Sequence, residues 1–448
     1  MGEALLPTVK MNTGAHAIWR REWLASPARL RRKPYRLALP SSEAIAASLV
    51  CAAVCFNFVL AFLNAHVSSL DRGSVILVEV VIVSITLMVC FVSNNRLMIP
   101  WIGVICIIVT IFLVGSMVRQ SYDPKHLRDV LLIPIFVALG LTFAKGSVVR
   151  LFCGLQALIL AVMVFEALAP RLFADTVRPW DFYRATRSIL DFKDSWHPES
   201  GLYLSAFRPE GRIIFEWLGI HRLSSIFLEP VSLGNWSIIV TIFLSAFWRL
   251  LSGRTLVFLA LSNIMLLIGC DGRLALTASV IIVVLSMFAH TLPRYFYLAY
   301  LPIAMLTTVV LATVFGFNVM TDDFPGRIAT TTIFLTSLDL PSVLGFDHSL
   351  IDRTADSGIS YLILTQSVFG VSVLWAAICL LQPPTSKTAI LLLHGICVYV
   401  SLLLMVSFSL FAMKTAAPLW FLYGYVRARG FLEGRRMDPI ESQSTSSA

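Results

Sequence analysis

Runs of about 18 or more apolar residues recur along most of the chain, and this pattern constrains the fold more than any other feature. A helix needs about 20 apolar residues to cross the hydrocarbon core of a bilayer. Composition agrees, because 57% of the 448 residues are hydrophobic and only 14% are charged, whereas a soluble domain averages roughly a quarter charged residues. The sequence therefore predicts an all-α, polytopic membrane protein.

The apolar runs predict about twelve membrane spans. They cover residues 44–64, 75–94, 98–118, 130–144, 148–168, 228–248, 255–270, 274–292, 295–318, 358–381, 388–408 and 412–426, of which the fourth and the last are short. The chain then divides into a basic N-terminal segment (1–43), five spans (44–168), a long loop (169–227), four spans (228–318), a second long loop (319–357), three spans (358–426) and a polar tail (427–448). The tail has the composition of a disordered segment.

Lysine and arginine in short loops predict the orientation, since these residues favour the cytoplasmic side. They precede the first span and recur in every second turn: Arg29, Arg31, Arg32, Lys33, Arg36, Arg96, Lys145, Arg150, Arg249, Arg254, Arg294, Lys387, Arg427, Arg429, Arg435 and Arg436. Both termini are therefore predicted to be cytoplasmic, and both long loops are predicted to face the opposite side. About forty mostly polar residues precede the first span, which is unlike a cleavable secretory signal.

Charge and cysteine usage exclude other classes of protein. The formal charge of +9 does not indicate nucleic-acid binding, because the basic residues collect at helix ends and in a tail instead of on one soluble face. All eight cysteines lie within or at the ends of apolar segments, without the spacing of a zinc site or a disulfide framework. We expect no metal and no cofactor.

The first long loop combines balanced charge with many aromatic residues. The aromatic residues are Trp180, Phe182, Tyr183, Phe192, Trp196, Tyr203, Phe207, Phe215 and Trp217. This mixture suits carbohydrate, whose apolar C–H faces stack on rings while its hydroxyls require polar partners. The alternative is an interfacial aromatic belt with amphipathic helices that lie on the membrane.

Three arginines stand at the predicted outer ends of spans. Arg222 precedes the sixth span, Arg273 opens the eighth and Arg327 follows the ninth. One such arginine commonly reaches a lipid phosphate at the membrane surface. Three on the same side favour a dedicated phosphate site, because the planar guanidinium group binds phosphate oxygens bidentately and stays charged.

Three segments resemble the bacterial O-antigen polymerases and ligases. The segment "RLSSIFLEPVSLGNW" resembles their Arg-x-x-small-x-Phe-x-x-Pro motif, and "CDGRLALTASV" resembles their small-Arg-small segment that opens the next-but-one span. The segment "GRIATTTIFLTSLDLPSVLGFDHSLIDRTADSGISYLILTQSVFGVSVLW" is similar to their second outer loop. The resemblance covers about residues 220–375, and its order and spacing are more specific than any one motif.

The resemblance implies an integral-membrane glycosyltransferase of the GT-C type in a bacterial inner membrane. Such enzymes move a glycan from an undecaprenyl pyrophosphate carrier to an acceptor sugar at the periplasmic face, without an essential metal. Arg222 and Arg273 would then neutralise the pyrophosphate with help from Arg327, and Arg208 and Arg212 are further candidates. A flippase and a chain-length regulator are the protein partners expected of such a pathway.

The general base is left open by the residues. Ligases of the family show His-Asn just before the tenth span, where this chain has Asp356 and Ser357. A carboxylate can serve as base in sugar chemistry, so Asp356 is a candidate, with Glu229 and His348 as rivals. Glu229 has two alternatives: a salt bridge, or a charge at the start of a helix.

Three functions follow from these patterns. The absent His-Asn pair and the glutamate in "FLEP" favour a polymerase of exopolysaccharide or capsule type over a ligase that joins the glycan to a lipid core. A transporter or carrier-lipid flippase is the alternative from another class. Transporters commonly contain repeats and broken spans near the midplane, and neither is evident in the sequence. Glu79 and Lys414 are ionisable groups near or within lipid, which makes them functional candidates.

Overall fold

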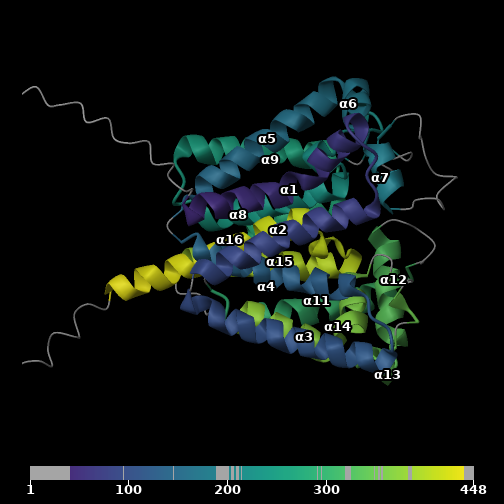
Figure 1. The fold of residues 1–448 in the computed structure, drawn as a ribbon, viewed down its shortest axis with the longest axis vertical. Coiled ribbons are helices and arrows are strands. Elements are labelled where there is room, and N and C mark those ends of the chain that lie inside the picture. Colours follow the sequence, from purple (N-terminus) through teal and green to yellow (C-terminus); the bar gives the residue numbers. More distant parts are fainter. Residues whose placement is uncertain are drawn as a thin grey trace, which may run out of the picture. The chain divides into compact units, whose positions relative to one another are not determined.

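The computed structural model describes residues 41–93, 95–144, 146–187, 201–202, 206–207, 211–212, 214–289, 291–293, 295–317, 324–347, 349–351, 354, 357–381 and 386–437. These residues are almost entirely helical, and Figure 1 shows the long helices running beside one another. No strand occurs in this part of the chain, only an isolated antiparallel bridge between Phe207 and His221.

Every predicted span corresponds to a long helix. The helices are α1 (Ser42–His66), α2 (Arg72–Ser93), α3 (Ile99–Arg119), α4 (Pro124–Thr142), α5 (Val148–Leu168), α8 (Pro230–Phe247), α9 (Gly253–Cys270), α10 (Arg273–Phe288), α11 (Tyr300–Phe315), α14 (Gly358–Leu380), α15 (Lys387–Val406) and α16 (Met413–Met437). The loops contain α6 (Pro170–Val177), α7 (Pro179–Arg187), α12 (Phe324–Ser337), α13 (Leu340–Val343) and the short 3₁₀ turns η1 (Arg96–Met98), η4 (Glu216–Leu218), η5 (Ser225–Phe227), η6 (Phe296–Ala299) and η8 (Ser409–Phe411).

Within the described residues, nine helices are long and apolar enough to cross a membrane. They are α1, α2, α3 together with η1, α5, α8, α9, α11 together with η6, α14 and α15. The chain is therefore a multi-pass membrane protein. Helices α4, α10 and α16 fall outside the nine: α10 is short, and α4 and α16 carry charged residues in their first turns.

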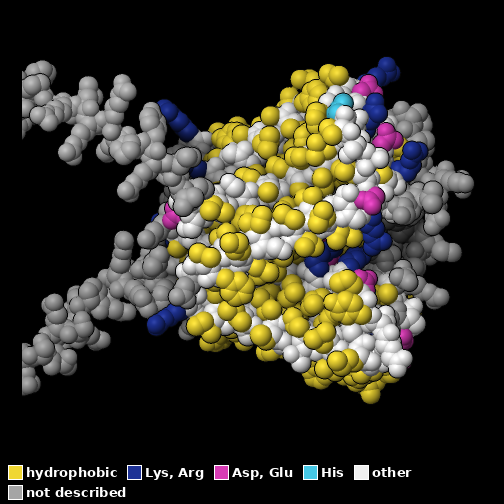
Figure 2. Space-filling model, in the orientation of Figure 1, with side chains coloured by type: hydrophobic (Ala, Val, Ile, Leu, Met, Phe, Trp, Pro, Cys, Tyr) yellow, Lys and Arg dark blue, Asp and Glu magenta, His cyan; other side chains and the backbone are white. Residues whose placement is uncertain are grey.

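Burial separates central helices from peripheral ones. Most of the apolar stretch of α8, α14 and α15 is buried, whereas most of that of α2 and α11 is exposed. Figure 2 shows hydrophobic side chains over the middle of one face, with charged side chains gathered toward the two ends of the helices. Because lipid is as apolar as the protein core, this exposed band suits contact with hydrocarbon.

Helices α4 and α16 approach each other closely at two glycines. A Cβ atom built on Gly140 would lie 2.1 Å from the carbonyl oxygen of Phe421, and one on Gly424 would lie 2.1 Å from that of Val137. Small residues allow membrane helices to pack backbone against backbone. This crossing joins the fourth span to the last one and brings the start of α16 into the centre of the helices.

We expect Gly424→Ala to destabilise the protein by about 3 kcal/mol, the upper end of overpacking effects, because the obstructing atom belongs to backbone. Gly154→Ala is the matched control, since a Cβ atom there meets nothing within 4 Å, and relief from glycine's entropy cost predicts a gain of roughly 0.5–1 kcal/mol. The unfolding midpoint of the purified protein in detergent measures both variants. Equal midpoints for the two would contradict the close packing.

Helix α14 is broken at Ser367, which has φ 61° and ψ 165°. The interruption lies inside a predicted span, so the sequence-based expectation that no span is broken was wrong. Arg119 of α3 donates from Nη1 to the carbonyl oxygens of Gly345, at 2.6 Å, and Leu364, at 3.5 Å. The arginine thereby satisfies a carbonyl group near the break, a requirement for irregular backbone inside a membrane protein.

One end of the helices collects the polar loops. Arg187 of α7 and Lys414 of α16 both pair with Glu229, just before α8, while Arg327 of α12 contacts the last residue of α15. Figure 1 shows α6, α7, α12 and α13 at this end and the C-terminal part of α16 at the opposite one. We call it the site end: α6, α7 and α12, the starts of α8, α10 and α16, and the ends of α9 and α15.

Candidate functional site

Two buried arginines hold the C-terminal end of α9. Arg212 donates from Nη2 to the carbonyl oxygens of Ile268 and, at 3.2 Å, Gly269. Arg222 donates from Nε to the carbonyl oxygen of Cys270 at 2.9 Å. The last carbonyls of a helix lack partners within the helix and carry partial negative charge, so cations stabilise them. Both predicted phosphate ligands therefore support the α9–α10 turn.

Further contacts fasten the same turn. Leu223 donates its backbone N–H to the carbonyl oxygen of Gly269 at 2.9 Å. Asp271 takes the left-handed conformation that ends α9, with φ 45°, and its Oδ1 accepts the backbone N–H of Ile214 at 2.9 Å. Aspartate tolerates this conformation better than most residues. The loop and the turn together fix the position at which α10 begins.

Arg273 is the first residue of α10 and the cation at this turn with unused donors. Its side chain is half-buried, its Nε is buried without a hydrogen-bond acceptor, and it forms no ion pair within the described residues. A cation is unfavourable at a helix N-terminus, where the dipole is positive. Backbone N–H groups and a guanidinium group at one helix start do suit an oxyanion.

A fully buried glutamate supports the turn from the other side. Glu166, in the last turn of α5, accepts the backbone N–H groups of Ser224 at 2.9 Å and Ser225 at 2.6 Å, and the hydroxyl of Ser224 at 3.0 Å. His221 lies 3.4 Å from its Oε1. Sequence reasoning missed Glu166; an acidic residue near the end of an apolar span was the available signal.

Glu229 is an ion-pair residue that bridges two cations. Its Oε1 lies 2.6 Å from Nη1 of Arg187, and its Oε2 lies 2.6 Å from Nζ of Lys414. Ser232 donates its hydroxyl to Oε2 at 2.8 Å, and Lys414 also donates to the carbonyl oxygen of Phe227 at 3.0 Å. Although Glu229 stands at the N-cap position of α8, its side chain makes no capping hydrogen bond. Of the alternatives that the sequence left open, the salt bridge is the one present.

The electrostatic surroundings of Glu229 favour its charged form. Burial by itself raises the pKa of the carboxyl, but Arg187 and Lys414 outweigh that effect and hold the pKa well below its usual range. The pair therefore stabilises the fold above the unfolded pKa of about 4.3, and this contribution is lost as pH falls through the lower folded value. A carboxylate held this way is a weak proton acceptor near neutral pH.

A second polar network joins three helices beside the first. Arg128 of α4 pairs with Glu79 of α2 and with Asp129, whose Oδ1 lies 2.6 Å from Nη2. The hydroxyl of Tyr361, on α14, donates to Oδ2 of Asp129 at 2.7 Å. Glu79 lies within electrostatic range of Arg187 as well, so the two networks are neighbours.

Arg327 contacts a different helix end from Arg222. Its Nη1 lies 3.4 Å from the carbonyl oxygen of Val406, the last residue of α15, and Thr331 on the next turn of α12 donates to the carbonyl oxygen of Met405 at 2.7 Å. The predicted arginines are thus distributed over the ends of α9 and α15. Arg208, His348 and Asp356 lie outside the described residues, so their roles stay predictions.

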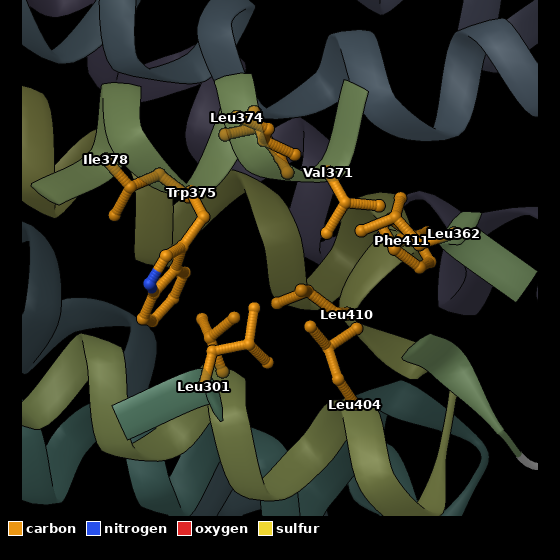
Figure 3. Close-up of a pocket in the computed structure, with 11 residues that line it drawn as sticks. Leu301, Leu362, Val371, Leu374, Trp375, Ile378, Leu404, Leu410 and Phe411 are labelled. Carbon is orange, nitrogen blue, oxygen red and sulfur yellow. The ribbon is translucent and has the colours of Figure 1, made fainter. Parts of the chain in front are cut away.

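An apolar pocket lies among α4, α11, α14, α15 and η8. It is lined by Ile133, Leu301, Leu362, Val371, Leu374, Trp375, Ile378, Val400, Leu404, Leu410 and Phe411. Figure 3 shows the labelled side chains arranged around a common space. The ring of Phe411 lies 5.7 Å from that of Tyr361, measured between centroids, so the pocket borders the second polar network. Its lining suits hydrocarbon.

Comparisons with protein-family models, with curated proteins and with solved structures find no match to this chain.

Proposed function

We propose that this chain is a twelve-span, GT-C-type membrane glycosyltransferase that polymerises a bacterial polysaccharide at the periplasmic face of the inner membrane. The donor is a glycan on undecaprenyl pyrophosphate, and the acceptor is the sugar of another carrier-linked repeat unit. The ordered resemblance of residues 220–375 to O-antigen polymerases and ligases supports the class of reaction. The unpaired guanidinium group of Arg273 at the site end is the structural observation that carries the proposal.

The reaction places distinct demands on the residues of the site end. A bond forms between the acceptor oxygen and the anomeric carbon, the bond from that carbon to the pyrophosphate oxygen breaks, and undecaprenyl pyrophosphate leaves. Arg273 binds the oxygens on which negative charge grows, because a preorganised cation stabilises developing charge without reorganisation. Arg212 and Arg222 position Arg273 through the end of α9. The acceptor proton passes to a base, for which Asp356 and His348 remain the candidates.

A flippase or transporter of carrier lipid is the second candidate. The break of α14 at Ser367 favours it, since discontinuous helices are typical of transport sites. The position of the charges opposes it, because Arg273, Glu229 and Lys414 lie at helix ends and not in the middle of the spans.

Reconstitution distinguishes these functions. The purified protein in proteoliposomes receives undecaprenyl-pyrophosphate oligosaccharide with a fluorescent lipid-core acceptor. A polymerase produces a ladder of longer carrier-linked glycans together with free undecaprenyl pyrophosphate. A ligase labels the lipid core instead. Movement of the donor between leaflets with neither product would contradict enzymatic activity and support the transporter.

A further inference from the structure

Arg427 is a buried cation at the end of the helices opposite the site end. It lies 13 residues after Lys414 on α16, which corresponds to about 20 Å along the helix axis. Its side chain is only 7% exposed, and neither Nη1 nor Nη2 has a hydrogen-bond acceptor. No carboxylate of the described chain forms an ion pair with it.

Two further donors without acceptors pack on the same aromatic ring. The guanidinium carbon of Arg427 lies 4.9 Å from the ring centroid of Tyr423. The rings of Trp101, on α3, and Trp420 lie 6.0 Å and 6.2 Å from that centroid. Both indoles are fully buried, and neither Nε1 has an acceptor. The hydroxyl of Tyr423 already donates to the carbonyl oxygen of Ile378 at 2.7 Å.

The unsatisfied atoms around Tyr423 all lack the same partner, an acceptor. A buried charge without a counter-ion costs several kcal/mol, and each unpaired buried donor costs about 1–3 kcal/mol. Such costs persist in a folded protein when a bound group removes them. A planar guanidinium fork matches the oxygens of phosphate, and its position near the end of a long helix places it where headgroups lie.

We propose that Arg427 binds a phosphate group, supplied by the headgroup of a membrane phospholipid or by inorganic phosphate. The site stands apart from the glycosyltransfer proposed above and does not depend on it. Tyr423 supports the guanidinium group by a cation–π contact. The indole N–H groups of Trp101 and Trp420 are the nearby donors that an oxyanion would also satisfy.

Thermal unfolding of the purified full-length protein in phosphate-free detergent tests the site. The probes are dioleoyl phosphatidylglycerol, dioleoylglycerol, which lacks the phosphate, and inorganic phosphate. A ligand at 100 times its Kd stabilises the folded state by about 2.7 kcal/mol, so phosphatidylglycerol should raise the midpoint of the wild type by several degrees and dioleoylglycerol should not. Inorganic phosphate raises it too if the free ion is the source.

Matched variants on α16 separate this site from general lipid effects. Arg429 is exposed and donates to the hydroxyl of Tyr425 at 2.9 Å, so Arg429→Gln should keep the phosphatidylglycerol shift while Arg427→Gln loses it. Arg427→Met should be more stable than the wild type without phosphate, because it removes an uncompensated charge, and less stable with phosphatidylglycerol. An absent shift in the wild type, or an equal shift in both Arg427 variants, would overturn the proposal.

Discussion

Arg273→Ala should reduce polymer formation by the reconstituted protein about 10²–10³-fold, the usual effect of removing one donor that stabilises developing negative charge. Arg273→Lys should recover part of the rate, because a lysine keeps the charge but not the bidentate fork. The unfolding midpoint should stay within experimental error of the wild type, since the Arg273 side chain has no partner to lose among the described residues. Glycan length on gels and release of undecaprenyl pyrophosphate measure the rate.

Two comparisons make the Arg273 result specific. Arg254→Ala changes an exposed arginine at the other end of α9 and should leave both rate and midpoint unchanged. Arg222→Ala removes a hydrogen bond to the end of α9, so it should lower the midpoint together with the rate. Full-length polymer from Arg273→Ala would show that this arginine does not bind the leaving pyrophosphate.

Lys414→Met should destabilise the folded protein by about 3–5 kcal/mol, because it leaves one oxygen of a buried carboxylate without its cation. Lys414 is 2% exposed and lies 2.6 Å from Glu229. The double variant Glu229→Gln with Lys414→Met should be much closer to wild type than either single change, since neither charge is then left alone. Denaturation midpoints in detergent give the free energies of unfolding.

The control for this cycle is Lys125→Met, at an exposed lysine in the first turn of α4, which should have an effect of less than about 0.5 kcal/mol. If Lys414→Met matches Lys125→Met, the ion pair contributes nothing to stability. If the single and double variants are equally destabilised, Lys414 acts through packing and not through Glu229.

Hydropathy located the helices well because each span has to bury about 20 consecutive apolar residues, which is a local property of the chain. The predicted span 388–408 and helix α15, Lys387–Val406, differ by only one or two residues at each end. The break at Ser367 left no such trace. It depends on Gly345, whose chain lies beside Ser367, and on Arg119 from another helix.

The candidate site was predicted only in part. The sequence marked Glu229, Glu79 and Lys414 as charges near lipid but not what they pair with. Glu229 and Lys414 are 185 residues apart, and Asp129 and Tyr361 are 232 apart. Arg128, Asp129, Arg187 and Tyr361 were missed, because no local pattern distinguishes a residue that pairs across the helices from one that faces solvent.

The sequence by itself determined that the chain is helical, crosses a membrane several times and gathers arginines beside particular span ends, since hydrophobic length and charge are read residue by residue. Tertiary structure alone decided what each charge does. It assigned Arg212 and Arg222 to the end of α9 and Glu229 to an ion pair, and it left Arg273 and Arg427 without partners. The physical reason is that the free energy of a charge depends on its burial and on the groups within a few ångströms, which only the packing of distant segments provides.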